Sequence, residues 1–209
     1  MQTLFSLDLC GDYVIISMHD CDNGKVVFFR GDVMKSQKRK ARYKAFYEKQ
    51  KRLHHLLREH AGDILDSKNF RSTKAYIQHG DMTVHQHCQN VAKYSIALSE
   101  KLRIRCSKRE LIRGALLHDY FLYDWHDAEH CSIWKLHGFY HPGRALKNAN
   151  AEYKLTLREK DIIGKHMWPL TIRPPMCREA WIVTCADKWC SLLETFHFHR
   201  GHGAKRAQR

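Results

Sequence analysis

Histidine and aspartate residues that could bind metal recur at wide intervals from residue 87 onward. His87 is followed after 31 residues by the adjacent pair His118 and Asp119, and Asp187 comes 68 residues after Asp119. Each lies within or at the end of a segment with helical periodicity, and the helices of a bundle can each direct one ligand inward. Mixed imidazole and carboxylate ligands suit iron, manganese, zinc or nickel. We therefore predict a site for one or two divalent transition-metal ions.

Asp187 is the most informative of these residues. It stands in the segment 181–193, which is otherwise largely apolar. A carboxylate on an apolar helix needs a basic partner or a metal, because an unpaired buried charge is costly. A salt bridge to a neighbouring base is the simpler alternative, and a His-Asp dipeptide alone is common. The ordered set of four residues favours the metal.

The elements that must position these residues are expected to be helices from residue 34 onward. Ser107 and Glu110, and likewise Thr156 and Glu159, have the spacing of capping boxes that open helices. Pro142 suits the first turn of a further helix. The expected helices cover residues 36–60, 81 or 83 to about 102, 107 to about 119, 142 to about 151, 156–166, and 179 to about 196.

The N-terminal region has a different pattern. Residues 12–18 and 25–29 are short apolar or β-branched runs, and Asn23-Gly24 between them suits a tight turn. The predicted fold is therefore mainly α, with a small N-terminal β-hairpin. We expect a hairpin appendage at 1–33, a basic helical segment at 34–70, the metal-binding domain at 71–198 and a basic disordered tail at 199–209.

The charge of the chain indicates which ligands it could attract, and its cysteines indicate a reducing environment. The formal charge is +14, and residues 35–58 carry ten Lys or Arg against one Glu. Such a charge can attract phosphate-bearing ligands or nucleic acid. The eight cysteines include no C-x-x-C pair. Without an apparent export signal or a membrane-spanning run, they are expected to be reduced thiols in a cytoplasmic protein.

The motifs around the predicted ligands resemble those of a known family. His87 in HCQNVA, His118-Asp119 in ALLHD and Asp187 in CADK match the H…HD…D signature of the HD superfamily of metal-dependent phosphohydrolases. This resemblance covers residues 82–196. The segments 136–146 and 165–169 look like a little-characterised bacterial branch. That branch shares extra histidines with HD-GYP phosphodiesterases and HD-type symmetrical diadenosine tetraphosphatases, which use two metals.

The resemblance implies a helical HD bundle and a second metal. Asp119 would bridge the two ions, and His141 and His166 would hold the second, since His141-Pro142 matches the His-Pro of the HD-GYP group. His137 is the alternative to His141, because residues four apart can share a helix face. Phe121 and Leu122 stand where the family often has Gly and Lys.

The implied activity is hydrolysis of a phosphate ester or anhydride of a nucleotide or similar small molecule, by metal-activated water. His118 and Asp119 would then be catalytic residues as well as ligands. Candidates for binding the substrate are Lys188, Arg144, Lys165 and His137. A homodimer is compatible with the sequence.

Two other functions remain open. The basic helix at 35–58 interleaves Tyr43, Phe46 and Tyr47 with lysines, which would suit RNA; such binding would weaken steeply with salt and survive loss of the metal ligands. Alternatively, an HD-fold di-iron oxygenase would use the same ligands. Oxygen consumption by iron-loaded protein would distinguish oxidation from hydrolysis.

Overall fold

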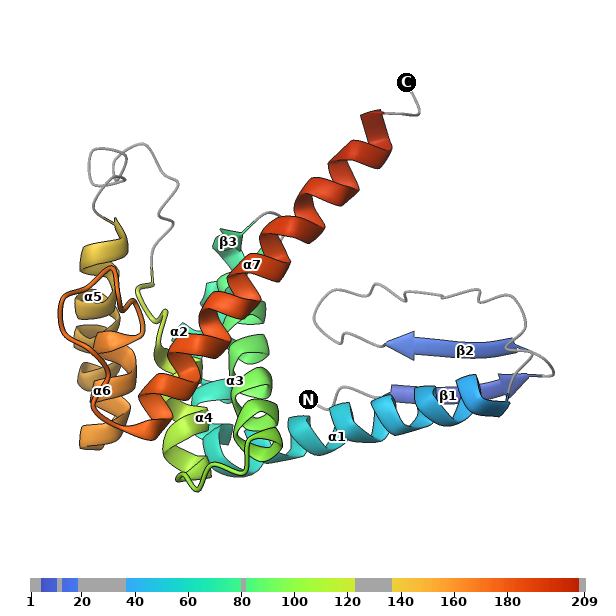
Figure 1. The fold of residues 1–209 in the computed structure, drawn as a ribbon, viewed down its shortest axis with the longest axis horizontal. Helices are drawn as coiled ribbons and strands as arrows, with labels where there is room; N and C mark the ends of the chain where they lie inside the picture. Colours follow the sequence, from blue (N-terminus) through green and yellow to red (C-terminus); the bar gives the residue numbers. More distant parts are fainter. Residues whose placement is uncertain (1–4, 11–12, 19–36, 80–81, 123–136, 207–209) are drawn as a thin grey trace. The chain divides into compact units, whose positions relative to one another are not determined.

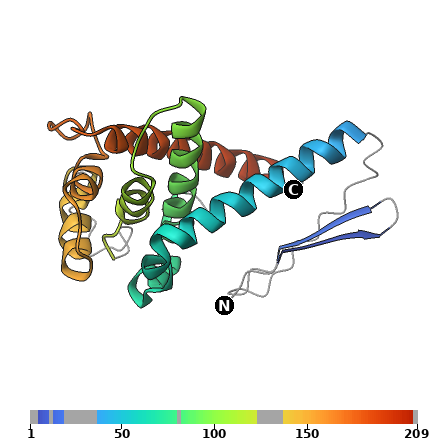
Figure 2. The same ribbon diagram turned by 90° about the horizontal axis from the view of Figure 1, so that it is seen from below.

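The computed structural model in Figures 1 and 2 describes residues 5–10, 13–18, 37–79, 82–122 and 137–206. The chain divides into two compact units, Met1–Arg52 and Leu53–Arg209. The elements are β1 (Phe5–Cys10), β2 (Tyr13–Met18), α1 (Gln37–Asp66), α2 (Lys68–Ser72), the 3-10 helix η1 (Thr73–Ala75), β3 (Ile77–His79), β4 (Met82–Thr83), α3 (Val84–Lys101), α4 (Lys108–Leu117), α5 (His137–Glu152), α6 (Leu157–Lys165) and α7 (Arg178–Arg206).

The predicted fold class is confirmed, because the described residues are mainly α-helical with a small antiparallel hairpin near the N-terminus. The predicted strand 12–18 corresponds to β2. It pairs with β1, from Phe5 opposite Met18 to Cys10 opposite Tyr13. β1 was not predicted, although its residues alternate apolar and polar as in a half-buried strand. The predicted partner 25–29 lies outside the described residues.

The helices that matter for the site pack side by side in the second unit. α3 lies against α4 and α7, and α6 lies against α4, α5 and α7. Their shared interior is a cluster of fully buried aliphatic and aromatic side chains, among them Ile96, Leu116, Ile162 and Val183. Burial of each such side chain stabilises the fold by about 1.5–3 kcal/mol. This core fixes the positions of the helix ends that carry the histidines.

Side-chain caps set the starts of three of these helices. Thr83 caps α3 and Thr156 caps α6 in full capping boxes with Gln86 and Glu159, and the Ser107 hydroxyl accepts from the backbone N–H of Glu110. Each cap satisfies an N–H that has no partner within its helix. The predicted starts at 107 and 156 are confirmed.

Three helices extend beyond their predicted ends. α1 reaches Asp66 rather than ending at residue 60, with a non-helical backbone at Ala61. α5 begins at His137, five residues before the expected start, so Pro142 lies inside the helix. α7 continues to Arg206 rather than ending near residue 196. The predicted domain limits at 33, 70 and 198 stay a prediction. Within the part of the chain that is described, no helix is both long and apolar enough to cross a bilayer.

Gly114 allows the close approach of α4 to α6, and it provides a test of this packing. A Cβ at residue 114 would lie 2.9 Å from Cβ and Cγ2 of Ile162, whereas a Cβ at Gly143 would meet nothing within 4 Å. We expect Gly114→Ala to destabilise the protein by about 1–3 kcal/mol through overpacking. Gly143→Ala, on the exposed face of α5, should be neutral or stabilise it by up to about 1 kcal/mol. Urea denaturation of both variants measures these changes, and equal effects would contradict the close packing.

Candidate metal centre

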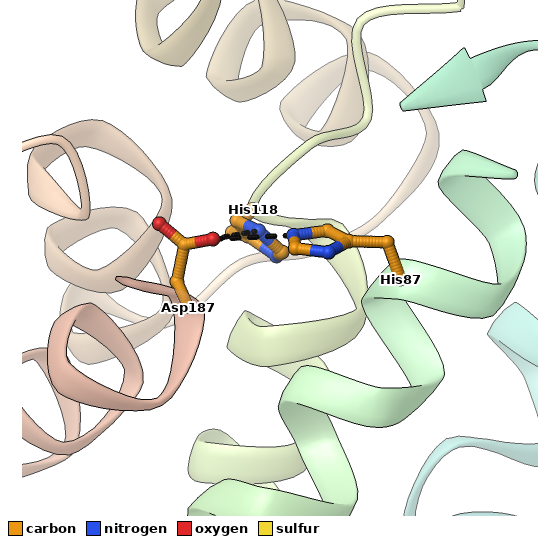
Figure 3. Close-up of side chains that lie close together, drawn as sticks. All are labelled: His87, His118 and Asp187. Carbon is orange, nitrogen blue, oxygen red and sulfur yellow. Dashed lines mark hydrogen bonds and ion pairs between the residues drawn. The ribbon is translucent and has the colours of Figure 1, made fainter. Parts of the chain in front are cut away.

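Three helices bring the buried side chains of His87, His118 and Asp187 together in one cluster (Figure 3). His87 comes from the first turns of α3, His118 is the C-cap of α4, and Asp187 lies on α7. Nε2 of His87 is 3.1 Å and Nε2 of His118 is 3.6 Å from the same carboxylate oxygen, Oδ1 of Asp187. We call these residues the first cluster.

Asp119 connects this cluster to a second one. Its Oδ2 atom is 3.4 Å from Nε2 of His118 and 3.8 Å from Nε2 of His87. Its Oδ1 atom is 3.2 Å from Nε2 of His141 on α5 and 3.5 Å from Nε2 of His166, the C-cap of α6. Asp119, His141 and His166 form the second cluster. The two oxygens of one carboxylate therefore face two different groups of imidazoles.

The spacing of these donor atoms fits ligands that share an ion. Two ligand atoms bound to one ion at about 2.1 Å lie about 3.0 Å apart at right angles and about 3.4 Å apart in a tetrahedron. The N···O and N···N contacts within the two clusters run from 2.9 Å, between Nε2 of His141 and Nε2 of His166, to 3.6 Å, between Nε2 of His118 and Oδ1 of Asp187. Within the described part of the chain, Nε2 of His118 and Oδ1 of Asp119 are buried and make no hydrogen bond. Unpaired buried polar atoms are costly, and a bound cation would satisfy both.

Two of the histidines owe their orientation to the helix ends on which they lie. Nδ1 of His118 is 2.8 Å from the carbonyl of Ala115, and Nδ1 of His166 is 2.9 Å from the carbonyl of Ile163. Carbonyl groups in the last turn of a helix receive no hydrogen bond from the helix's own N–H groups. They are therefore free to accept hydrogen bonds from these imidazole N–H groups. Each ring is thereby fixed with the Nε2 lone pair toward the cluster. The negative ends of the two helix dipoles also favour a cation there.

Charges within the clusters favour positive charge on the Nε2 side of the rings. Burial alone would lower the pKa of His87, but the carboxylates of Asp187 and Glu194 raise it to about 10. Burial would raise the pKa of Asp119 and of Asp187, yet the imidazole of His118, with the other histidines, holds both well below the usual range. The carboxylates stabilise this positive charge whether a proton or a metal ion supplies it.

Metal binding should consequently depend steeply on pH. In the ion-free protein His87 is protonated at neutral pH, because its pKa is about 10. The pKa of His118 is raised as well, and a metal ion must displace the ring protons, so the apparent affinity should rise at least about tenfold for each pH unit below these pKa values. We expect Zn²⁺ or Co²⁺ to bind at least about 100-fold more tightly at about pH 8 than at about pH 6. Competition titrations against a chelator measure this, and equal affinity at both values would show that no ring proton is displaced.

Two residues at the centre were not predicted. Glu194, on α7, accepts a hydrogen bond of 2.8 Å from Nδ1 of His87, and Gln78, on β3, donates one of 2.7 Å from Nε2 to Oδ2 of Asp119. Gln78 lies where the pairing of β3 with β4 shifts register. Irregularities of this kind in strand pairing change the direction of the side chains beside them. Both residues lie far along the chain from the side chains that they contact, so no local pattern reveals them.

The turn after Asp119 is held by α5. The side-chain amide of Asn148 donates to the backbone carbonyls of Tyr120 and Phe121, at 3.0 Å in each case. The ring of Phe121 lies edge-on to His141, with ring centroids 6.0 Å apart. Phe121 therefore packs against a histidine of the second cluster.

The predicted substrate-binding residues lie in different surroundings. Lys188 is half-exposed beside the first cluster, with Nζ 4.0 Å from Oδ2 of Asp187, and it donates to the carbonyl of His166. Lys165 forms a 2.6 Å ion pair with Asp161, and Arg144 is exposed on α5. The side chain of His137 lies outside the described residues. The structure places His141 against Asp119, and the choice between His137 and His141 stays a prediction.

No family model, curated protein or solved structure matches this chain. The fold and the site themselves define a mainly α-helical protein with buried His and Asp groups that could hold a metal ion. Cys88, Cys106, Cys177, Cys185 and Cys190 are free thiols, in agreement with the prediction of reduced cysteines. Membership of the HD superfamily stays a prediction from the motifs.

Proposed function

We propose that this chain is an HD-type, metal-dependent phosphohydrolase that acts on a nucleotide or similar small phosphorylated molecule. One observation carries the proposal: the carboxylate of Asp119 divides its two oxygens between two histidine clusters. This is the arrangement expected of a ligand that bridges two ions. Paired ions in such sites stabilise the attacking and leaving oxygens of phosphoryl transfer and lower the pKa of bound water toward neutrality.

Each of the six residues would bind one or both ions. His87, His118 and Asp187 would hold one ion, His141 and His166 the other, and Asp119 both. Their burial excludes bulk solvent, since none of the six is more than 6% exposed. Low local polarity strengthens their interaction with charge that develops during the reaction.

Lys188 is the best placed of the predicted substrate-binding residues. Its ammonium group lies beside Asp187, and its side chain is 43% exposed, so it can reach a phosphate at the edge of the site. Arg144 lies three residues after His141 and is the second candidate. Lys165 is engaged with Asp161 and is the weakest of the three.

The decisive experiment combines metal analysis with a substrate screen. The purified chain is analysed for bound metals and then supplied with Mn²⁺ or Fe²⁺. It is next incubated with bis(p-nitrophenyl) phosphate, mononucleotides, dinucleotides and dinucleoside polyphosphates. We expect about two ions per chain and the release of phosphate or a mononucleotide. A chain that binds no transition metal, or binds it and hydrolyses none of these compounds, would refute the proposal.

A second candidate function has one observation in its favour. The N-terminal part of α1 exposes Lys40, Arg42, Lys44, Lys49 and Lys51. Tyr43 and Phe46 are also exposed there, with ring centroids 6.5 Å apart. An exposed basic segment with accessible rings suits single-stranded RNA. Salt-sensitive RNA retention by the Asp119→Ala variant would support this function independently of the metal centre.

A further inference from the structure

Glu194 is a buried carboxylate that touches the first cluster from outside the predicted motif. It is 8% exposed, and Oε2 lies 2.8 Å from Nδ1 of His87. The side-chain amide of Asn90 donates to its other oxygen, Oε1, at 3.5 Å. Within the described residues no Lys or Arg pairs with it, although a buried carboxylate requires compensation. The compensation must come through the imidazole of His87.

The position of His87 within its helix explains why it needs such a partner. His118 and His166 lie at helix C-termini, where free carbonyls accept the Nδ1–H groups. His87 is the fourth residue of α3. The first turn of a helix has free N–H groups and no free carbonyls. The backbone near His87 therefore cannot orient this ring, and a side chain from another helix must do so.

The geometry of α7 allows it to hold the ring from both sides. Asp187 and Glu194 are seven residues apart on α7, and seven residues differ by about 20° around a helix, so both point the same way. Asp187 faces Nε2 of His87 at 3.1 Å, and Glu194 faces Nδ1 at 2.8 Å. A ring with Nδ1–H donated to a carboxylate presents the Nε2 lone pair and is a stronger metal ligand.

We propose that Glu194 is a positioning residue that fixes the tautomer and orientation of His87 and thereby sets the metal affinity of the first cluster. The inference rests on the proposed function, because it assumes that the cluster binds metal. It assigns no substrate contact to Glu194. If Glu194 positions His87, the length and hydrogen-bonding ability of the side chain at residue 194, rather than its charge alone, should determine how a substitution changes metal affinity.

The test compares three variants by Co²⁺ titration and visible absorption. Glu194→Gln keeps the reach and an acceptor oxygen but loses the charge, whereas Glu194→Asp keeps the charge but loses the reach. We expect Glu194→Asp and Glu194→Ala to weaken Co²⁺ binding by about 10–100-fold and to change the ligand-field spectrum. Glu194→Gln should stay within about fivefold of the wild type. Thr195→Ala, an exposed neighbour on α7, is the control and should match the wild type.

The outcomes separate the two proposals. Wild-type affinity and spectrum in Glu194→Asp and Glu194→Ala would overturn the role of Glu194 while leaving the metal centre intact. Weak binding by Glu194→Gln together with normal binding by Glu194→Asp would indicate a charge effect and would overturn positioning. Equal Co²⁺ binding by the wild type and Asp187→Ala, or none by the wild type, would overturn the metal centre itself. Circular dichroism of the ion-free variants checks that each is folded.

Discussion

Replacing Asp119 with alanine is expected to remove bound metal and hydrolytic activity together while leaving a folded helical protein. Asp119 supplies one oxygen to each cluster, at 3.4 Å from Nε2 of His118 and 3.2 Å from Nε2 of His141. Without it each cluster loses a neighbouring carboxylate oxygen, and no shared carboxylate connects the two clusters. We expect hydrolysis to fall by about 10³-fold or more. Elemental analysis and single-turnover hydrolysis measure the two losses.

Matched variants distinguish loss of the ligand from general damage. Asp119→Asn keeps the size of the side chain and its hydrogen-bonding groups, yet it should also lose metal because the charge is gone. Asp66→Ala removes an aspartate that is exposed and paired with Arg58 and Arg71, so metal content and activity should not change. Retention of full activity by Asp119→Ala would refute the catalytic assignment. If circular dichroism shows that Asp119→Ala is unfolded, the same measurements are made on Asp119→Asn instead.

The parts of the fold that follow from local chemistry were predictable. Ser107 and Thr156 begin helices because their hydroxyl groups accept from the backbone three residues later, which is a signal contained in four residues. The histidines and aspartates that the structure brings together lie on helical segments that the sequence periodicity already indicated. The backbone carbonyls that orient His118 and His166 also lie only three residues back.

The parts that depend on tertiary contacts could not be predicted. Gln78 meets Asp119 across 41 residues and Glu194 meets His87 across 107. Gln78 acquires its direction from an irregular strand pairing, which leaves no mark in the sequence. For Glu194 the only signal was its spacing of seven residues from Asp187. That spacing places the two carboxylates on one face but does not identify what they face.

A second large effect is expected at Arg113, whose guanidinium lies buried between α1, α4 and α6. It is 4% exposed; Nε donates to Glu159 at 3.0 Å, and Nη1 donates to both oxygens of Asp63 at 2.7 and 2.8 Å. Arg113 is on the helix that ends at His118, and Glu159 is on the helix that ends at His166. The ion pair thus fixes the relative position of two ligand-bearing helices.

We expect Arg113→Met to destabilise the protein by about 3–5 kcal/mol, because it leaves the carboxylate of Glu159 buried without its partner. Asp63 adds little to this figure, since its side chain is 57% exposed and water screens its charge. A loss of this size lowers the melting temperature by about 10 °C in a chain of this length. Differential scanning calorimetry of the ion-free protein measures the change without contributions from bound metal.

The neighbouring Arg109 provides the control. It is 56% exposed and lies 4.0 Å from the same carboxylate oxygen of Glu159, so Arg109→Ala should cost less than about 1 kcal/mol. The double variant Arg113→Met/Glu159→Gln should recover part of the loss, because the unpaired charge has been removed along with its partner. If Arg113→Met cost no more than Arg109→Ala, the buried ion pair would not hold α4 against α6. The alignment of His118 with His166 would then depend on apolar packing such as that of Gly114 on Ile162.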